Sequence, residues 1–167
     1  MRQAIFIDKE KCVGCHACIV ACKLEHELPP HPVQPPVGNP RGPALIRLVR
    51  VGPQIRGDEV HQYFQPVLCV HCDEAPCIDA CPSSAVYRDV ETGITLVSGE
   101  DCTGCESCLE VCPFEAPQFY DDRLYLCDLC MHRSDERKRV GRTTACEAAC
   151  QARAIHVRSS PGRGSRA

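Results

Sequence analysis

Residues 12–22 read CVGCHACIVAC, and residues 102–112 read CTGCESCLEVC. Both stretches have the spacing C-x2-C-x2-C-x3-C, and together they hold eight of the sixteen cysteines in this chain of 167 residues. The other eight cysteines form two further quartets that also close with C-x3-C. The four quartets are Cys12, Cys15, Cys18, Cys22; Cys69, Cys72, Cys77, Cys81; Cys102, Cys105, Cys108, Cys112; and Cys127, Cys130, Cys146, Cys150. No cysteine is left over, so the quartets decide how the chain is organised.

Disulfides, structural zinc and iron–sulfur clusters all use cysteine at this density. Two residues between cysteines suit thiolates around one metal centre and suit a relaxed disulfide poorly. Zinc sites normally use two separated pairs, whereas C-x2-C-x2-C-x3-C is the bacterial ferredoxin run, whose fourth cysteine ligates a second cluster. The trailing proline of that run is present as Pro82 and Pro113, while Lys23 and Gln151 replace it in the outer quartets. We therefore predict four [4Fe–4S] clusters, with zinc or disulfides as the alternative.

The composition leaves little material for an ordinary core. Only 5% of the residues are aromatic and none is tryptophan, so we expect the clusters to replace an apolar core and the apo chain to be poorly structured. The formal charge of −3 falls to about −11 when the thiolates of four oxidised clusters are counted. An acidic protein is not expected to bind nucleic acid or anionic membrane. One basic run, interpreted as a solvated loop with a docking patch as the alternative, comprises Arg133, Arg137, Lys138, Arg139 and Arg142.

The first residues, MRQAIFIDKEKC, contain no apolar signal core, twin arginine or membrane span. We expect a cytoplasmic location without direct membrane insertion, which also suits reduced thiols, and leave open export with a partner that carries a signal.

Short elements are predicted between the cysteines. We expect strands at 4–8, 44–51, 60–64 and 124–126, a helix at 17–27, a proline-rich connection at 29–43 and a hairpin from 86–89 and 94–97. Gly14 and Gly104 are expected to permit the tight turns of their loops. Three segments, starting at Cys81, Cys112 and Cys150, share the repeat Cys-x-x-x-Ala followed by strand-like residues. The fold class predicted is α+β, with duplicated bacterial-ferredoxin-like modules.

The middle quartets are adjacent and most regular, whereas the outer two lack the proline, which favours a nested arrangement of modules. The boundaries predicted are 1–28 with 120–158 for the first two-cluster module, 29–65 for the connection and strands, 66–119 for the second module, and 159–167 for a disordered tail.

The ordered set of motifs resembles a known family. KCVGCHACIVACK, CVHCDEAPCIDACP, DCTGCESCLEVCPF, and CDLCMHR with a later ACEAAC are similar to the four-cluster ferredoxin subunits of molybdenum and tungsten oxidoreductases. These include the beta subunits of dimethyl sulfoxide reductase-type enzymes and the small subunits of bacterial tungsten aldehyde oxidoreductase or benzoyl-CoA reductase complexes. Because the chain is short, the resemblance favours a tungsten aldehyde oxidoreductase-like complex, with a bis-pterin molybdenum enzyme next.

The resemblance also implies which cysteines share a cluster. Carried over position by position, it gives Cys12, Cys15, Cys18 and Cys150 for cluster 1; Cys22, Cys127, Cys130 and Cys146 for cluster 2; Cys69, Cys72, Cys77 and Cys112 for cluster 3; and Cys81, Cys102, Cys105 and Cys108 for cluster 4.

Full cysteine ligation leaves no iron open to substrate, so no catalytic residue is expected in this chain. The predicted function is electron relay between a large pterin-containing tungsten or molybdenum subunit and a flavin-containing or other redox subunit, with repeated assembly through the end clusters as a further hypothesis. A free polyferredoxin and a zinc-binding interaction module are the alternatives. The seven histidines show no ligand spacing, so none is assigned to metal. His16 and His71, inside cluster loops, are interpreted as surface residues, with a hydrogen bond toward a cluster sulfur or a pH-dependent potential as the alternative.

Overall fold

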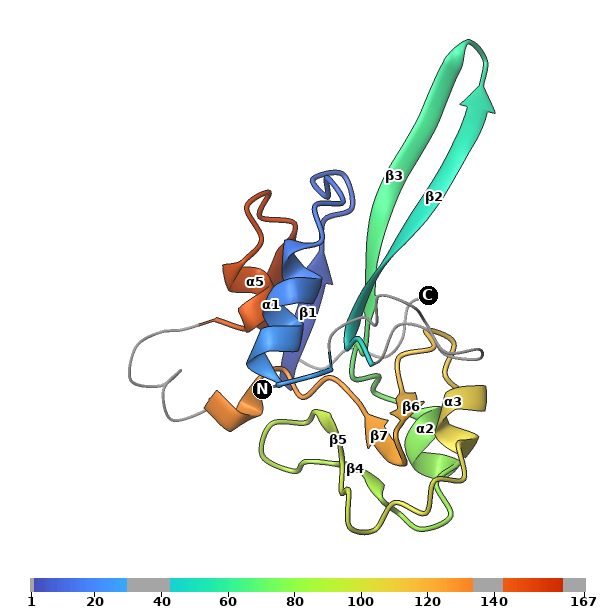
Figure 1. Cartoon of the computed structure of the whole chain (residues 1–167), viewed down its shortest axis with the longest axis vertical. Helices are drawn as coiled ribbons and strands as arrows, with labels where there is room; N and C mark the ends of the chain where they lie inside the picture. The colour runs from blue at the N-terminus through green and yellow to red at the C-terminus, as the bar shows by residue number, and fades with distance from the viewer. Residues whose placement is uncertain (1, 30–42, 134–142, 161–167) are drawn as a thin grey trace.

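A computed structural model describes residues 2–29, 43–133 and 143–160. In these ranges the chain is α+β, with short helices and four antiparallel sheets of two strands each (Figure 1). The elements are β1 (Arg2–Ile7), α1 (Ala17–Glu25), β2 (Ile46–Arg56), β3 (Glu59–Leu68), α2 (Pro76–Asp79), β4 (Val86–Arg88), β5 (Thr95–Val97), α3 (Ser107–Glu110), β6 (Gln118–Tyr120), β7 (Arg123–Tyr125), η1 (Met131–Arg133), α5 (Ala145–Ala148) and β8 (Ile155–Ser160).

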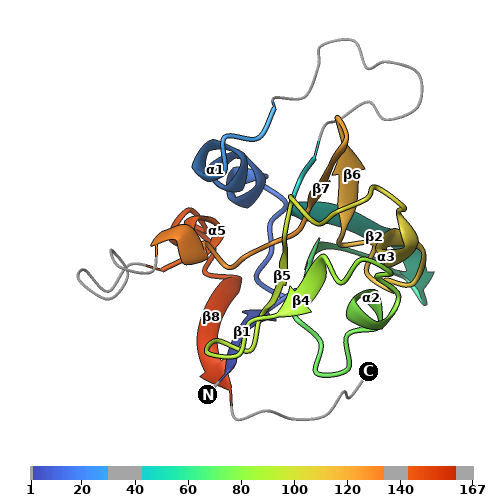
Figure 2. The same cartoon turned by 90° about the horizontal axis from the view of Figure 1, so that it is seen from below.

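The first and last described elements lie together. β1 pairs with β8 from Arg2 opposite Ser160 to Ile7 opposite Ile155, and α1 packs against α5 beside them (Figure 2). The predicted strand 4–8 and helix 17–27 are therefore present with slightly different ends. β8 also extends two residues into the predicted tail, whose remaining residues 161–167 lie outside the described part of the chain.

β2 and β3 form one long hairpin that projects from the body of the molecule (Figure 1). The sequence predicted two short separate strands here, at 44–51 and 60–64. The structure joins them through Gly57 and Asp58, with Gly57 at φ +64°, the left-handed conformation that two-residue hairpin turns need. The register shifts between Val51 and Gln54, where Pro53 has no N–H to give to the ladder.

The middle of the chain forms the other side of the molecule, where α2 and α3 lie beside the β4–β5 and β6–β7 hairpins (Figure 2). The predicted hairpin at 86–97 is confirmed, and the strand predicted at 124–126 corresponds to β7. The Arg88 guanidinium donates to the carbonyl oxygens of Cys72, at 2.6 Å, and Asp73, at 2.8 Å. This side chain thereby fixes β4 to the loop that carries Cys69 and Cys72.

Cysteines make up much of the interior. Eight of the sixteen are buried, and most of these belong to the same apolar clusters as Ile46, Ile94 and Ile155. The thiols thus occupy positions that aliphatic side chains hold in an ordinary core. Most of the proline-rich connection (30–42) and four of the five residues of the basic run lie outside the described residues; the fifth, Arg133, forms an ion pair with Glu25.

Candidate iron–sulfur centres

The first C-x2-C step of each quartet, called its C-x2-C loop from here on, makes the same backbone turn. The residue before the second cysteine has a positive φ in every loop: +70° at Gly14, +52° at His71, +69° at Gly104 and +54° at Leu129. A left-handed residue at this point curls the chain so that the two flanking cysteines can face one centre. The turn predicted for the two glycines is confirmed, and the same turn occurs in the other two loops without glycine.

The two kinds of loop are packed differently. A Cβ atom on Gly14 would lie 2.6 Å from the ring of Phe64, and one on Gly104 would lie 2.9 Å from the ring of Phe119. At the other two loops the left-handed residue is itself buried, because His71 is 0% exposed and Leu129 is 1% exposed. The interpretation of His71 as a surface residue is therefore wrong, whereas His16 is exposed as expected.

The repeat Cys-x-x-x-Ala has a backbone explanation. Its fourth residue is again left-handed, with φ of +56° at Ser84, +47° at Glu115 and +50° at Arg153. This turn directs the next backbone N–H back to the cysteine, so that Ala116 donates to Cys112 Sγ at 3.5 Å and Ala154 donates to Cys150 Sγ at 3.2 Å. N–H groups aimed at sulfur are among the features that set the reduction potential of an iron–sulfur cluster.

Two small hollows are each lined by four cysteines. One contains Cys12, Cys15, Cys18 and Cys150, from the first loop and the end of α5. The other contains Cys69, Cys72, Cys77 and Cys112, from the loop before α2 and the end of α3. In both, the fourth cysteine comes from a different quartet than the first three.

Among the remaining eight cysteines, neighbours are identified by their effects on one another's pKa. Burial raises the pKa of Cys22 far above its ordinary value, and the neighbouring Cys146 and Cys130 add to the rise. Burial likewise raises the pKa of Cys127, with Cys22, Cys69 and Cys146 as further causes. For Cys108, burial raises the pKa to about 11, and Cys77, Cys81 and Cys102 contribute.

Exposure differs between the groups of cysteines. Cys22, Cys127, Cys130 and Cys146 are all buried, whereas Cys15 and Cys105 are exposed and lie in the first and third quartets respectively. These four buried thiols belong to the first and last quartets, and each quartet with the spacing C-x2-C-x2-C-x3-C has one exposed thiol.

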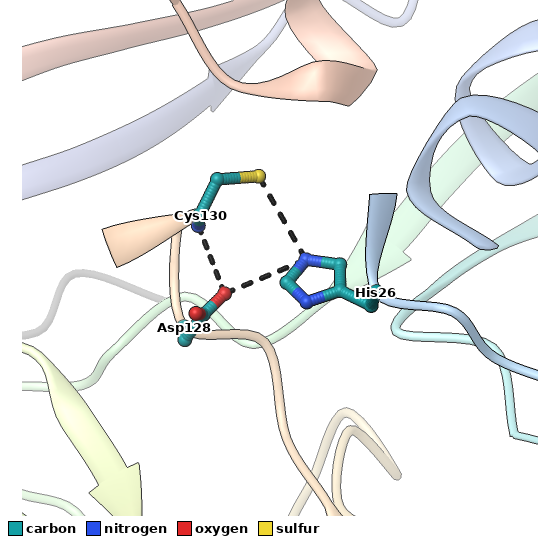
Figure 3. Close-up of side chains that lie close together, drawn as sticks. All are labelled: His26, Asp128 and Cys130. Atoms are coloured by element: carbon teal, nitrogen blue, oxygen red, sulfur yellow. Dashed lines mark hydrogen bonds and ion pairs between the residues drawn. The ribbon is translucent and has the colours of Figure 1, made fainter. Parts of the chain in front are cut away.

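One histidine approaches an interior cysteine from a distant part of the sequence. His26 Nε2 lies 3.7 Å from Cys130 Sγ and 3.5 Å from Asp128 Oδ1, and the Cys130 N–H donates to the same carboxylate oxygen at 2.9 Å (Figure 3). Burial lowers the pKa of His26, which disfavours its charged form. These three groups form the one potential metal-binding trio of this kind within the described residues. The sequence reasoning missed it because His26 and Cys130 are 104 residues apart.

Further charged groups around this trio hold it in place. His132 Nδ1 lies 3.1 Å from Asp128 Oδ2 and its Nε2 lies 2.8 Å from Glu25 Oε1, so both ring nitrogens face carboxylates. Glu25 also forms an ion pair with Arg133. The end of α1 is thus tied to η1 beside Cys130.

The donors fit iron–sulfur clusters. None of the sixteen cysteines forms a disulfide, their loops curl around shared hollows, and apolar side chains such as Ala75 and Leu126 surround the thiols. Such a set of soft thiolate ligands in a largely dry environment is what cubane clusters use. The fold and the donors together define a ferredoxin-like iron–sulfur protein of the electron-transfer class.

Comparison with known proteins also identifies an iron–sulfur protein. Two family models, each described as a 4Fe-4S dicluster domain, match residues 60–160 and residues 11–86. The chain belongs to this 4Fe-4S dicluster family, and two dicluster domains correspond to four [4Fe–4S] clusters, which the number of cysteines fits. In the part of the chain that the structure describes, no helix has the length and apolar character needed to cross a membrane.

Several relatives are similar over most of this chain. The electron transfer subunit of a thiosulfate reductase of Salmonella typhi is 33% identical over 149 residues, covering 89% of this chain and 71% of the relative. A tetrathionate reductase subunit of Salmonella typhimurium is 32% identical, with coverage of 89% and 54%. A sulfite dehydrogenase subunit of Allochromatium vinosum is 33% identical, with coverage of 90% and 66%. The chain therefore spans only 54 to 71% of the length of these relatives.

Proposed function

We propose that this protein is the electron-transfer subunit of an oxidoreductase whose large subunit holds a molybdenum-pterin active site. The names of its relatives, subunits of thiosulfate and tetrathionate reductases and of a sulfite dehydrogenase, support a complex that acts on sulfur oxyanions. The preference for a tungsten aldehyde oxidoreductase-like partner relied on chain length, and none of these three relatives supports it. Molybdenum is accordingly our first choice of partner metal. A flavin-containing or other redox subunit would exchange electrons at the far end.

We propose the ligand sets inferred from the resemblance. The two hollows support cluster 1 (Cys12, Cys15, Cys18, Cys150) and cluster 3 (Cys69, Cys72, Cys77, Cys112). The mutual charge effects of buried thiols support cluster 2 (Cys22, Cys127, Cys130, Cys146). Cluster 4 (Cys81, Cys102, Cys105, Cys108) is supported in the same way. Cys81 and Cys102 contribute to the raised pKa of Cys108, and Cys81 also acts on the pKa of Cys105.

The same neighbours support a linear order of the clusters. Cys146 contributes to the raised pKa of Cys18, which places the proposed clusters 1 and 2 side by side. In the same way, the effect of Cys69 on the pKa of Cys127 links clusters 2 and 3, and the effect of Cys77 on the pKa of Cys108 links clusters 3 and 4. The clusters supply reversible one-electron chemistry when bound. The chain's own part is to hold the sulfurs, exclude water from the interior sites and direct N–H groups to the cysteines.

We propose that the modules arose by duplication and keep the predicted boundaries, with 1–28 and 120–158 in one module and 66–119 in the other. The shared left-handed turn in all four C-x2-C loops supports a common origin. Sixteen cysteines without a disulfide suit a reducing compartment, and we keep the cytoplasm as the proposed location.

The projecting hairpin is the observation that favours a subunit of a complex over a free electron carrier. Its two strands pair only with each other among the described residues, so each strand has an open edge. Several apolar side chains on it face solvent, including Val49 at 44%, Val60 at 67% and Ile55 at 79% exposure. An open, apolar sheet edge is an aggregation hazard in a protein that diffuses alone, and it is explained if a partner covers it. The hairpin also borders a groove shared with Cys12 and Val13, next to proposed cluster 1.

Purification of the tagged chain from its native cells under anaerobic conditions tests this proposal. We expect a brown complex with about sixteen iron atoms per chain and a large subunit that contains pterin and molybdenum. The double variant Ile55→Ser, Val60→Ser should keep its iron and lose the large subunit. Val90→Ser, a matched change at a valine that is 97% exposed in another hairpin, should keep both.

Three results would contradict the proposal. Elution of the wild-type chain alone, with full iron content, would identify a free polyferredoxin. A colourless protein with zinc would identify a zinc-binding module. Tungsten in the large subunit would restore the preference based on chain length.

A further inference from the structure

The hydroxyl of Thr95, in the hollow of proposed cluster 3, is a buried polar group that none of the interactions described so far uses. Thr95 is the first residue of β5 and is 1% exposed. Its Oγ1 atom is buried and has no hydrogen-bond partner among the described residues. Buried hydroxyls are nearly always paired, because burial without a partner gives up the hydrogen bonds that water would supply. The hydroxyl therefore needs a hydrogen-bond partner other than the atoms of the described residues.

The backbone N–H of Thr95, unlike its hydroxyl, has a hydrogen-bond partner. Its N–H donates to His71 Nδ1 at 3.1 Å, and the same nitrogen lies 3.7 Å from Cys69 Sγ. Because Nδ1 accepts this bond, it carries no proton of its own. His71 thus holds β5 against the first cysteine loop of this site and fixes the position of the Thr95 side chain.

Apart from Thr95, the hollow is lined by cysteines and apolar residues alone among the described residues. Its other described lining residues are four cysteines (Cys69, Cys72, Cys77 and Cys112) and apolar residues such as Ala75 and Leu126. Thr95 is the single described residue of the lining that is neither a cysteine nor apolar. A hydroxyl in such a place has sulfur as its natural acceptor.

We propose that the Thr95 hydroxyl donates a hydrogen bond to a sulfur of the cluster held by Cys69, Cys72, Cys77 and Cys112, and so raises the reduction potential of that one cluster. The inference rests on the ligand set proposed above. Reduction adds negative charge to the cluster and its sulfurs, so a donor to sulfur stabilises the reduced form more than the oxidised form. Thr95 is a positioning and tuning residue, because its effect is on a potential and not on a ligand bond.

The substitution Thr95→Val tests this inference, because valine keeps the shape and removes the donor. Redox titration of the four-cluster protein, followed by electron paramagnetic resonance, should show one cluster with a lower potential and three unchanged. Thr95→Ser keeps the donor and should restore the potential of that cluster. Thr92→Val is the matched control, since the Thr92 hydroxyl bonds to Asp89 Oδ1 at 2.9 Å in the same hairpin, and it should leave all four potentials unchanged.

The variant Cys112→Ser identifies which signal belongs to this cluster, independently of Thr95. If Thr95→Val shifts the signal that Cys112→Ser alters, the inference holds. If Thr95→Val shifts no potential, shifts a different signal or shifts all four together, the inference is overturned, while Cys112→Ser still reports on the ligand set. An increase in thermal stability of Thr95→Val with unchanged potentials would show that the hydroxyl has no acceptor in the holo protein. Co-purification of the large subunit should be the same for all Thr95 variants, so failure of the subunit role is seen separately.

Discussion

The ring of Phe64 lies directly over Gly14, where a Cβ atom would come within 2.6 Å of the aromatic carbons. Phe64 lies near the middle of β3, so this contact joins the projecting hairpin to the loop between Cys12 and Cys15. Its counterpart on the other side of the molecule, Phe119 over Gly104, is nearly as close at 2.9 Å. The two loops therefore need glycine for two reasons, a left-handed backbone and the absence of a side chain.

Gly14→Ala should lower the stability of the protein for both of these reasons. We expect a loss of about 1–2 kcal/mol from the left-handed conformation, with an additional loss from the clash with Phe64. Gly57→Ala is the control, because Gly57 also has a positive φ, +64°, but nothing within 4 Å of its Cβ position. Thermal bleaching of the cluster absorbance should begin at a lower temperature in Gly14→Ala than in Gly57→Ala. Equal bleaching curves would show that the ring contact is unimportant.

Thr144→Val should lower the potential of the proposed cluster 2. The Thr144 hydroxyl is buried and lies 3.4 Å from Cys146 Sγ, and its hydrogen bond opposes the effect of burial, which raises the pKa of that thiol. Thr143→Val is the matched control, because the neighbouring hydroxyl bonds to Glu147 instead. Redox titration of both variants checks the prediction, and a shift of equal size in both would argue against a specific bond to Cys146.

Glu25→Gln should loosen the attachment of α1 to η1. The Glu25 side chain is only 10% exposed and accepts from both His132 and Arg133. Loss of its charge should cost about 1–3 kcal/mol, the range for hydrogen bonds to charged groups. Glu27→Gln makes the same change at an exposed position two residues away and should be neutral. The measurement is the denaturant concentration at which cluster absorbance is lost; no difference between the two variants would contradict the prediction.

Serine substitution should sort the cysteines into the proposed ligand sets. Cys12→Ser and Cys150→Ser should alter the same paramagnetic signal, although 138 positions separate them in the sequence. Cys146→Ser, only four positions from Cys150, should alter a different signal, the one also altered by Cys22→Ser. If Cys146 and Cys150 affected the same signal, the nested arrangement would be wrong.

Removal of iron should unfold much of the chain. The buried cysteines take positions in the core, so without metal they must be buried as thiols with little else to pack against. We expect anaerobic chelation to abolish most of the far-ultraviolet circular dichroism, and reconstitution with iron and sulfide to restore it. A folded apo protein would show that the apolar residues suffice.

The sequence predicts best what is local. The cysteine spacing, the turns at Gly14 and Gly104 and the hairpin at 86–97 follow from residues near each other in the chain. The left-handed turns at His71 and Leu129 could not be predicted in this way, because positive φ is uncommon for any residue other than glycine, although histidine adopts it more often than leucine. Their burial in the folded molecule stabilises a backbone that their side chains oppose.

Long-range contacts account for the other differences. The sequence predicts two separate strands at 44–51 and 60–64 and not one hairpin, because the residues between them, such as Ile55, give no local sign of pairing across Gly57 and Asp58. The place of His26 beside Cys130 does not follow from the sequence, because the two residues are 104 positions apart. The place of Thr95 does not follow from it either, because the hollow that Thr95 lines is built by residues from 69 to 126.

The pairing of β1 with β8 also sets the order in which the protein can mature. β1 cannot form its sheet until Ser160, its partner's last residue, has left the ribosome. The proposed ligands of clusters 3 and 4 lie between residues 69 and 112 and are all available well before that point. The proposed clusters 1 and 2 each need a cysteine from 146 or 150, so the first cysteines to be synthesised are among the last to find their partners. During synthesis, Cys12, Cys15 and Cys18 must therefore stay reduced and uncommitted while most of the protein is made.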